Sequence, residues 1–287
     1  MKTSLVPAEL LQETDKILFV AHLALGDFTY LQNFFKAFAE SYPHIKIHIW
    51  VNELRRTRCF WRWKHLKAYA LYDWLEACPF IHKVYRDTYA PHLFKRSRKE
   101  AVVENYPLVV SLATLRSYEY AGLARSLSPK GFVAGMQGTT AWWQFGKRRA
   151  YKKLDALIDV KPESVKGKHI SAVYASWFEQ LFGLEVSESS RFPVLATPDK
   201  WTLFAKLRFL KWGINKESSR FGKVIFINAY AKINKRTWPL ERVAELILAL
   251  KKNDAWGDVS FIVNIVPEEM KRAQEAWQKE QMACSKK

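Results

Sequence analysis

The sequence predicts an α/β protein with two Rossmann-like domains, each built on a parallel sheet. Three observations predict this fold. Strand and helix patterns alternate along most of the 287 residues, the apolar runs have the length of strands, and a polar, Pro-containing stretch separates two such series. The expected domains are therefore residues 1–190 and residues 191–287, a division that suits a chain of this length.

The first half of the chain begins with strand, helix and strand, which together form a βαβ unit with a right-handed crossover. The first strand is an apolar run, and the second shows alternation with period two. Gly183 is expected to end the last helix of this half. In chain order the expected elements are a strand at Ile17–Val20, a helix at Tyr30–Ser41, a strand at His44–Val51, a strand at Tyr106–Ala113, a helix at Ser117–Leu127, a strand at Gly131–Met136 and a helix at His169–Glu185.

The second half follows a linker expected over Val186–Lys200 and repeats the α/β pattern. Pro239 suits the first turn of a helix, where its missing N–H would have no partner anyway. Only about two strands fit after Gly222, whereas a complete Rossmann-like domain has about five or six, so we expect this domain to be incomplete. Its elements are a strand at Lys223–Tyr230, a helix at Pro239–Lys252, a strand at Asp258–Val266 and a helix at Pro267–Gln281.

The chain carries a large positive charge, with 46 Lys and Arg against 28 Asp and Glu, a formal net charge of +18. Such an excess implies an anionic partner: nucleic acid, a phosphorylated substrate or an acidic membrane face. No recognition helix, zinc finger or RNA-binding aromatic motif is found, so we expect no nucleic-acid partner. The N-terminus does not have the order of a signal peptide, and no apolar stretch approaches the ~20 residues of a membrane span. Three widely spaced cysteines fit a reducing compartment.

One carboxylate, Asp27, stands where the first strand gives way to a helix, next to a glycine, Gly26, that allows a tight turn. One interpretation is a helix N-cap, worth ~1 kcal/mol. The other is a general base directed into the crevice beyond the carboxyl ends of the strands. His22 is a candidate to line the same crevice, although a lone histidine there is more often structural.

A strand-to-helix loop in the second half, Asn228–Pro239, carries three cations. Cations beside the N–H groups of a helix start form a phosphate site. The alternative is a solvated basic loop. The three cations are Lys232, Lys235 and Arg236.

The stretch Leu54–Tyr69 contains no acid and alternates cations with aromatic rings. This composition suits an anionic membrane surface, a phosphorylated glycolipid or, by stacking, single-stranded nucleic acid. The alternative is a solvated helix face with buried aromatic side chains. A second basic run at Lys147–Lys153 is a candidate extension. The cations of the first stretch are Arg55, Arg56, Arg58, Arg62, Lys64 and Lys67, and its aromatic residues include Phe60, Trp61 and Trp63.

Taken together, these stretches resemble glycosyltransferase family 9, the ADP-heptose:lipopolysaccharide heptosyltransferases. The opening motif of that family is a strand, a small-residue turn with Gly-Asp, and a helix reaching "YP", and "ILFVAHLALGDFTYLQNFFKAFAESYPHIKIHIWV" resembles it. Three later segments are also similar: "YPLVVSLATLRS", "HISAVYASWFEQLFGLE" and "INAYAKINKRTWPLERVAELI". The resemblance spans roughly Ile17 to Trp277.

The resemblance implies a GT-B fold, in which the first domain binds the acceptor and the second binds a nucleotide sugar, ADP-heptose in this family. It implies an inverting glycosyltransferase that adds heptose, or a related sugar, to the acidic lipopolysaccharide core. Asp27 would be the catalytic base. Lys235 by residue type, or Arg236 by distance from Pro239, would stabilise the departing diphosphate with Lys232 nearby. The remaining candidates, on the acceptor side, are Gly26, His22, Arg55, Arg56, Arg58 and Arg62.

No cofactor or metal is expected, because side-chain cations and helix N-termini would neutralise the leaving group. The family ends with an Asp-Thr-Gly-x-x-His-type loop that this chain does not contain, so we expect part of the donor domain to be missing. The alternative function is therefore a non-catalytic, truncated relative that binds acidic glycolipid. The expected location is cytoplasmic, peripheral on the inner membrane.

Overall fold

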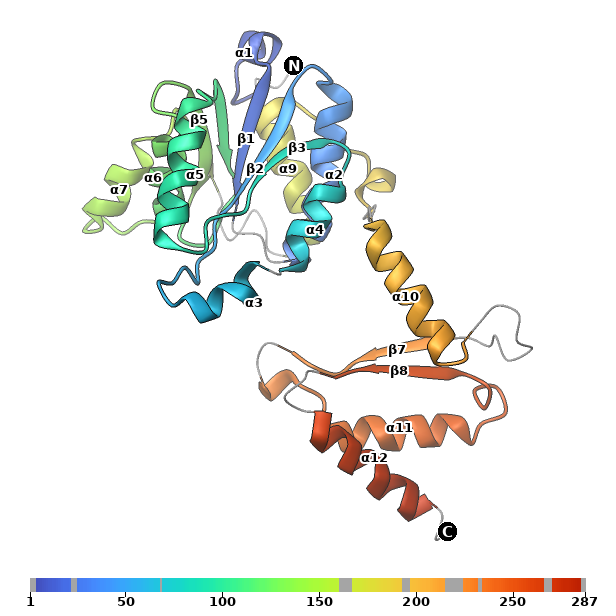
Figure 1. The fold of residues 1–287 in the computed structure, drawn as a ribbon. Coiled ribbons are helices and arrows are strands. Elements are labelled where there is room, and N and C mark those ends of the chain that lie inside the picture. Colours follow the sequence, from blue (N-terminus) through green and yellow to red (C-terminus); the bar gives the residue numbers. More distant parts are fainter. Residues whose placement is uncertain are drawn as a thin grey trace. The chain divides into compact units, whose positions relative to one another are not determined.

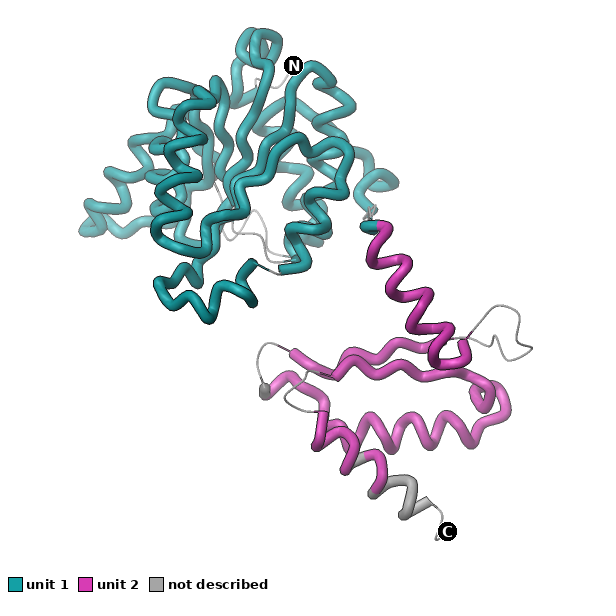
Figure 2. Tube along the Cα trace, in the orientation of Figure 1, with its two compact units in different colours: residues 1–198 teal, residues 199–287 magenta. Residues whose placement is uncertain are grey.

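A computed structural model describes residues 4–21, 25–67, 69–159, 167–192, 197–214, 224–231, 234–265 and 270–284. The chain divides into two compact units, Met1–Pro198 and Asp199–Lys287 (Figure 2). From the sequence we propose a similar division, residues 1–190 and 191–287. Each unit contains a parallel sheet with helices packed on it.

The first unit is built on a parallel sheet of six strands in the order β3-β2-β1-β4-β5-β6 (Figure 1). The order reverses at β1, which pairs with β2 on one side and β4 on the other. Ligands of open parallel sheets bind beyond the carboxyl ends of the strands at such a point. The strands are β1 Lys16–Ala21, β2 Lys46–Val51, β3 Ile81–Tyr85, β4 Leu108–Ser111, β5 Phe132–Gln137 and β6 Ala156–Asp159.

Helices cover both faces of this sheet (Figure 1). On one face Phe19 of β1 contacts Phe35 and Phe178, with ring centroids 4.8 and 6.1 Å away. On the other face Leu18 and Val20 belong to a separate buried cluster. The helices of this unit are α1 Ala8–Glu13, α2 Leu25–Ser41, α3 Trp63–Lys67, α4 Ala70–Ala77, α5 Pro91–Val103, α6 Ser117–Leu127, α7 Phe145–Tyr151 and α9 Ile170–Phe182, with 3-10 turns η1 Phe60–Arg62 and η2 Glu188–Arg191.

The strands and helices expected in the first half are all present, with shifted ends. The helix expected from Tyr30 begins at Leu25. Gly183 ends α9 in the left-handed conformation, φ 67°, which glycine adopts without strain. The sequence analysis predicted no strand at β3 or β6 and no helix at α1, α4, α5 or α7. The edge strand β3 and the charged helix α5 carry little apolar periodicity, and β6 is short.

The second unit contains two paired parallel strands in its described part, β7 Val224–Asn228 and β8 Ser260–Asn264. The expected helices are present as α11 Leu240–Lys251 and α12 Met270–Cys284. The core here is small, with Ala229, Val243 and Ile247 at its centre. A further helix, α10 Asp199–Lys211, begins at the end of the expected linker, and none of its residues is buried. No helix in the described part of the chain is long and apolar enough to cross a membrane.

A candidate site at the carboxyl edge of the first sheet

Asp27 lies at the carboxyl end of β1, where the strand order reverses. It is the third residue of α2 and is partly exposed. It therefore lies inside the first turn rather than at the N-cap, and Gly26 is likewise helical instead of forming a tight turn. A Cβ at Gly26 would have open space around it. Within the described residues no hydrogen bond or ion pair holds the Asp27 carboxylate.

The helix α9 faces this turn of α2. Burial raises the pKa of Tyr174 on α9, and the negative charge of Asp27 raises it further. The ring of His169, the N-cap residue of α9, stands edge-on to Tyr30 at 5.5 Å. The His169 Nδ1 also lies 2.8 Å from Ser171 Oγ. The ring of Tyr30, three residues after Asp27 on α2, therefore contacts the N-cap residue of α9.

The loop that follows β2 ends beside the same turn. The backbone N–H of Leu25 donates to the hydroxyl of Tyr69, 3.2 Å away. The guanidinium of Arg55 lies 5.7 Å from the Tyr69 ring centroid. Arg55 also holds the buried carboxylate of Glu53 through bonds of 2.8 and 2.7 Å. Burial alone would raise the pKa of Glu53, but the Arg55 hydrogen bonds and charge outweigh it and keep that pKa below its usual value.

Arg56 is also engaged with the protein. Its guanidinium donates to the Thr88 carbonyl oxygen at 2.9 Å and to Asn52 Oδ1 at 3.0 Å, and stacks 3.4 Å from the Phe94 ring centroid. Burial lowers its pKa. Arg58 and Arg62 differ, because both are exposed and no ion pair involves them in the described part of the chain. Of the four arginines proposed for the acceptor, these two are the most available to a ligand.

The aromatic residues of the same loop are not all buried. The exposed fractions of Phe60 and Trp61 are 68% and 65%, whereas Trp63 packs between Tyr89 and His92. A solvated helix with buried aromatic side chains therefore does not describe this loop. It presents cations and two aromatic rings to the solvent.

Arg116, which the sequence analysis did not single out as a functional residue, follows β4 at the same edge. It has φ 55° and ψ 36° as the N-cap residue of α6, and its side chain is exposed. A non-glycine residue in the left-handed region is uncommon and is often found at functional sites. Arg116 lines a cavity of about 250 Å³ together with Glu53, Arg56 and Glu119. The left-handed backbone of Arg116 could not be predicted from the sequence. The sequence pointed to this residue only as the arginine in the family-like segment "YPLVVSLATLRS".

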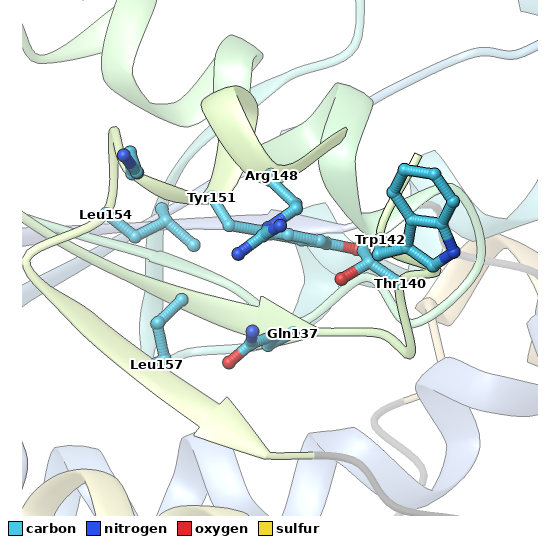
Figure 3. Close-up of a pocket in the computed structure, with 8 residues that line it drawn as sticks. Gln137, Thr140, Trp142, Arg148, Tyr151, Leu154 and Leu157 are labelled. Carbon is cyan, nitrogen blue, oxygen red and sulfur yellow. The ribbon is translucent and has the colours of Figure 1, made fainter. Parts of the chain in front are cut away.

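A larger cavity of about 510 Å³ lies farther along the edge (Figure 3). Its floor includes Gln137 at the end of β5 and Leu157 of β6, and Arg148 comes from α7. Tyr151 forms part of its wall. The Tyr151 hydroxyl lies 2.7 Å from Ser117 Oγ and accepts a hydrogen bond from the backbone N–H of Gly138 at 3.2 Å. Trp142 stands at its rim.

In the second unit, Lys235 and Arg236 lie in a 3-10 turn, η3 Asn234–Arg236, between β7 and α11. Both side chains are exposed. The loop is closed by hydrogen bonds from the Trp238 N–H to the Ala229 carbonyl at 2.9 Å, and from the Ala231 N–H to Thr237 Oγ1 at 3.2 Å. Two cations are thus held on a short, hydrogen-bonded loop at the carboxyl end of a strand, a position that suits a phosphate group.

Two of the predicted site residues, His22 and Lys232, lie outside the described residues. Within the described part of the chain, no group of three or more His, Cys, Asp or Glu side chains is placed to hold a metal ion.

No family model and no curated protein matches the chain. Solved structures do match. A glycosyl transferase family 9 protein from Veillonella parvula DSM 2008 superposes with a TM-score of 0.65 at 15% identity, over 92% of this chain and 66% of that one. The E. coli heptosyltransferase WaaC with ADP-2-deoxy-2-fluoro heptose gives 0.56 at 15% identity, over 91% and 72%. WaaC with ADP gives 0.55 at 14% identity, over 92% and 72%.

At these identities the similarity concerns the fold. It confirms the predicted α/β fold of GT-B type and the resemblance to glycosyltransferase family 9 at the level of structure. The chain spans about two thirds of the length of the Veillonella protein.

Proposed function

We propose that this chain is an inverting glycosyltransferase of the heptosyltransferase type. The observation that carries the proposal is the combination of a family 9 fold over 92% of the chain with a carboxylate, Asp27, at the strand-order reversal. That is the position where open parallel sheets bind ligands.

In the proposed reaction the Asp27 carboxylate takes the proton of an acceptor hydroxyl as that oxygen attacks the anomeric carbon of the donor sugar. The bond between the anomeric carbon and the diphosphate oxygen breaks, and the nucleoside diphosphate leaves with its electron pair. The first turn of α2 favours negative charge, because the N-terminus of a helix carries a partial positive charge. A carboxylate without a protein partner in the described structure is free to bind the hydroxyl.

The donor we propose is a nucleotide sugar, with ADP-heptose as the first choice, bound through its diphosphate at Lys235 and Arg236. Lys232, in the same loop, is the third proposed contact. The two described cations are exposed on a hydrogen-bonded loop and carry no ion pair within the described residues, so they are available to phosphate oxygens. They would neutralise the charge that develops on the leaving group.

The acceptor we propose is an acidic lipopolysaccharide core, reached at the cytoplasmic face of the inner membrane. Arg58 and Arg62 are exposed in the loop that follows β2, and Arg116 lines a cavity at the same edge of the sheet. These three are the primary contacts in this proposal. Arg55 and Arg56 support them, because their guanidinium groups already bind protein oxygens. Gly26 and His22 complete the proposed acceptor side.

The test is transfer of heptose from ADP-heptose to heptose-deficient lipopolysaccharide by the wild-type chain and by Asp27→Asn. General-base catalysis contributes ~10²–10⁴-fold, so we expect Asp27→Asn to lose at least about a hundredfold in turnover with the fold intact. Asp15→Asn is the matched control. This exposed carboxylate precedes β1 at the opposite edge of the sheet, so its loss is expected to leave turnover unchanged.

Equal turnover in Asp27→Asn and wild type would refute the role of Asp27. Absence of transfer by the wild-type chain, with glycolipid binding retained, would instead favour a non-catalytic protein that binds acidic glycolipid.

A further inference from the structure

Three large aromatic side chains are exposed in a single short segment between β5 and the end of α7. The exposed fractions of Trp142, Trp143 and Phe145 are 73%, 61% and 67%. Isolated apolar side chains on a surface are ordinary, but neighbouring exposed rings indicate a contact surface. We name residues 138–153 the α7 segment.

The α7 segment is also strongly basic. It contains no acid. One cation, Lys147, lies 5.2 Å from the Tyr118 ring centroid. The side chains of the other four form no ion pair in the part of the chain that the structure describes, and the next acid, Asp155, is already paired with Arg125 at 2.6 Å. The five cations are Lys147, Arg148, Arg149, Lys152 and Lys153.

The loop after β2 has the same character at the same edge of the sheet. There Phe60 and Trp61 are exposed, and Arg58 and Arg62 lie beside them. Because all strands of the sheet are parallel, the loops that follow β2 and β5 emerge at one edge. The two loops therefore place exposed rings and unpaired cations at the carboxyl edge of the first unit.

We propose that the α7 segment docks on an anionic lipid surface, with the Phe60–Arg62 turn as a second point of contact. Tryptophan and phenylalanine rings suit the boundary between headgroups and acyl chains, and cations around them suit anionic headgroups. A second copy of this chain fits poorly, because the same strongly positive surface would meet itself. The inference rests on the proposed function at one point, the choice of a membrane as the partner. Docking there would bring the carboxyl edge of the sheet close to a glycolipid acceptor.

The cavity at the base of the α7 segment supports this choice. Its volume is about 510 Å³, and its lining includes Arg148, Lys152 and the rim residue Trp142 (Figure 3). Gln137 and Thr140 add hydrogen-bonding groups. A phosphate-bearing headgroup would find two cations and polar groups inside the cavity while Trp142 remained among the lipids.

The experiment measures binding to vesicles of phosphatidylcholine with phosphatidylglycerol, and to vesicles of phosphatidylcholine alone, by cosedimentation and tryptophan fluorescence. We expect the wild-type chain to bind the anionic vesicles at low salt and to bind the neutral vesicles at least tenfold more weakly. Each surface cation near an anionic leaflet contributes about fivefold in affinity, and salt screens that contribution.

Two variants test the two parts of the segment. Trp142→Ser with Trp143→Ser should weaken binding at least tenfold, and so should Arg148→Ser, Arg149→Ser and Lys152→Ser combined.

Each of these two variants has a matched control. Val103→Ser removes an apolar side chain that is 83% exposed and lies ahead of β4, at the opposite edge. Arg98→Ser, Lys99→Ser and Lys130→Ser remove three exposed cations from α5 and the turn before β5. Both controls should bind like wild type.

The inference is overturned if wild type fails to bind anionic vesicles, or if the controls lose as much affinity as the variants. It is also overturned if soluble polyglutamate competes fully and the tryptophans have no effect, which would indicate an acidic protein partner. A dimer in sedimentation velocity that Trp142→Ser with Trp143→Ser dissociates would indicate a second copy instead. Vesicle binding without sugar transfer would leave this inference standing and count against the proposed function, and transfer without vesicle binding would do the reverse.

Discussion

His48 is a buried histidine whose burial predicts a loss of stability on mild acidification. It lies on β2 with an exposed fraction of 7%, and its Nδ1 is 2.7 Å from the hydroxyl of Tyr106, which is 2.9 Å from that of Tyr85. Burial lowers the pKa of His48 to about 4, an effect that the negative charge of Glu104 only partly opposes. The imidazole is therefore neutral in the folded protein at neutral pH.

The direction of the pH effect on stability follows from which state, unfolded or folded, gains the proton on His48 first as the pH falls. In the unfolded chain the imidazole has its ordinary pKa of 6.5 and gains a proton as the pH falls below that value, while the folded protein gains it only near pH 4. Between these values the unfolded state binds more protons, so the free energy of unfolding falls with the pH. The two pKa values give a loss of about 2 kcal/mol between about pH 8 and pH 5. That is a large part of the ~5–15 kcal/mol of a typical protein.

The assay is urea unfolding at both pH values for wild type, His48→Gln and the control His65→Gln. His65 is exposed on α3. We expect wild type and His65→Gln to lose about 2 kcal/mol on acidification, and His48→Gln to lose much less, whatever its stability at neutral pH. A loss in His48→Gln as large as that in wild type would show that His48 does not cause the pH dependence and would refute the reasoning.

Two further predictions concern the donor loop and the packing of the first unit. The double change Lys235→Ala, Arg236→Ala should weaken ADP-heptose binding at least about tenfold in titration calorimetry, since charged hydrogen bonds to phosphate are the strong ones; unchanged affinity would place the donor elsewhere. Gly131→Ala should lower the free energy of unfolding by about 2 kcal/mol or more, because its Cβ would lie 2.2 Å from the Tyr106 carbonyl oxygen. The control Gly122→Ala, in α6 with nothing within 4 Å, should raise it by about 0.5–1 kcal/mol, and similar losses in both would contradict this account.

The strands β1, β4 and β5 of the first unit were predictable because parallel central strands are continuous apolar runs. The alternation in His44–Val51 predicted a strand. In the structure β2 is buried on both faces from Ile47 onward, His48 included, because helices cover both sides of the sheet. A single sequence does not reveal which polar side chain will be covered by a helix distant in the chain. The edge strand β3 and the charged helix α5 were missed for a different reason, because both carry little apolar periodicity.

The candidate site, like the fold, could be predicted only in part from the sequence. The placement of Asp27 after a strand, and of Lys235 and Arg236 in a strand-to-helix loop, follows from local patterns, since parallel strands put such loops at one edge. The pairing of Arg55 with Glu53 and the stacking of Arg56 on Phe94 do not follow from those patterns. Local sequence shows that a run of arginines is basic, but which of them already have partners depends on where neighbouring loops lie.

The sequence alone established the α/β class, the positive charge, the basic aromatic loops and the carboxylate at the end of the first strand. These properties depend on residue type and on periodicity over a few turns. The tertiary structure decided the others: the strand order that reverses at β1, the burial of His48, the left-handed Arg116 and the exposure of Trp142 and Trp143. Each of these depends on contacts between segments far apart in the chain, because burial and strand order are set by which elements pack together.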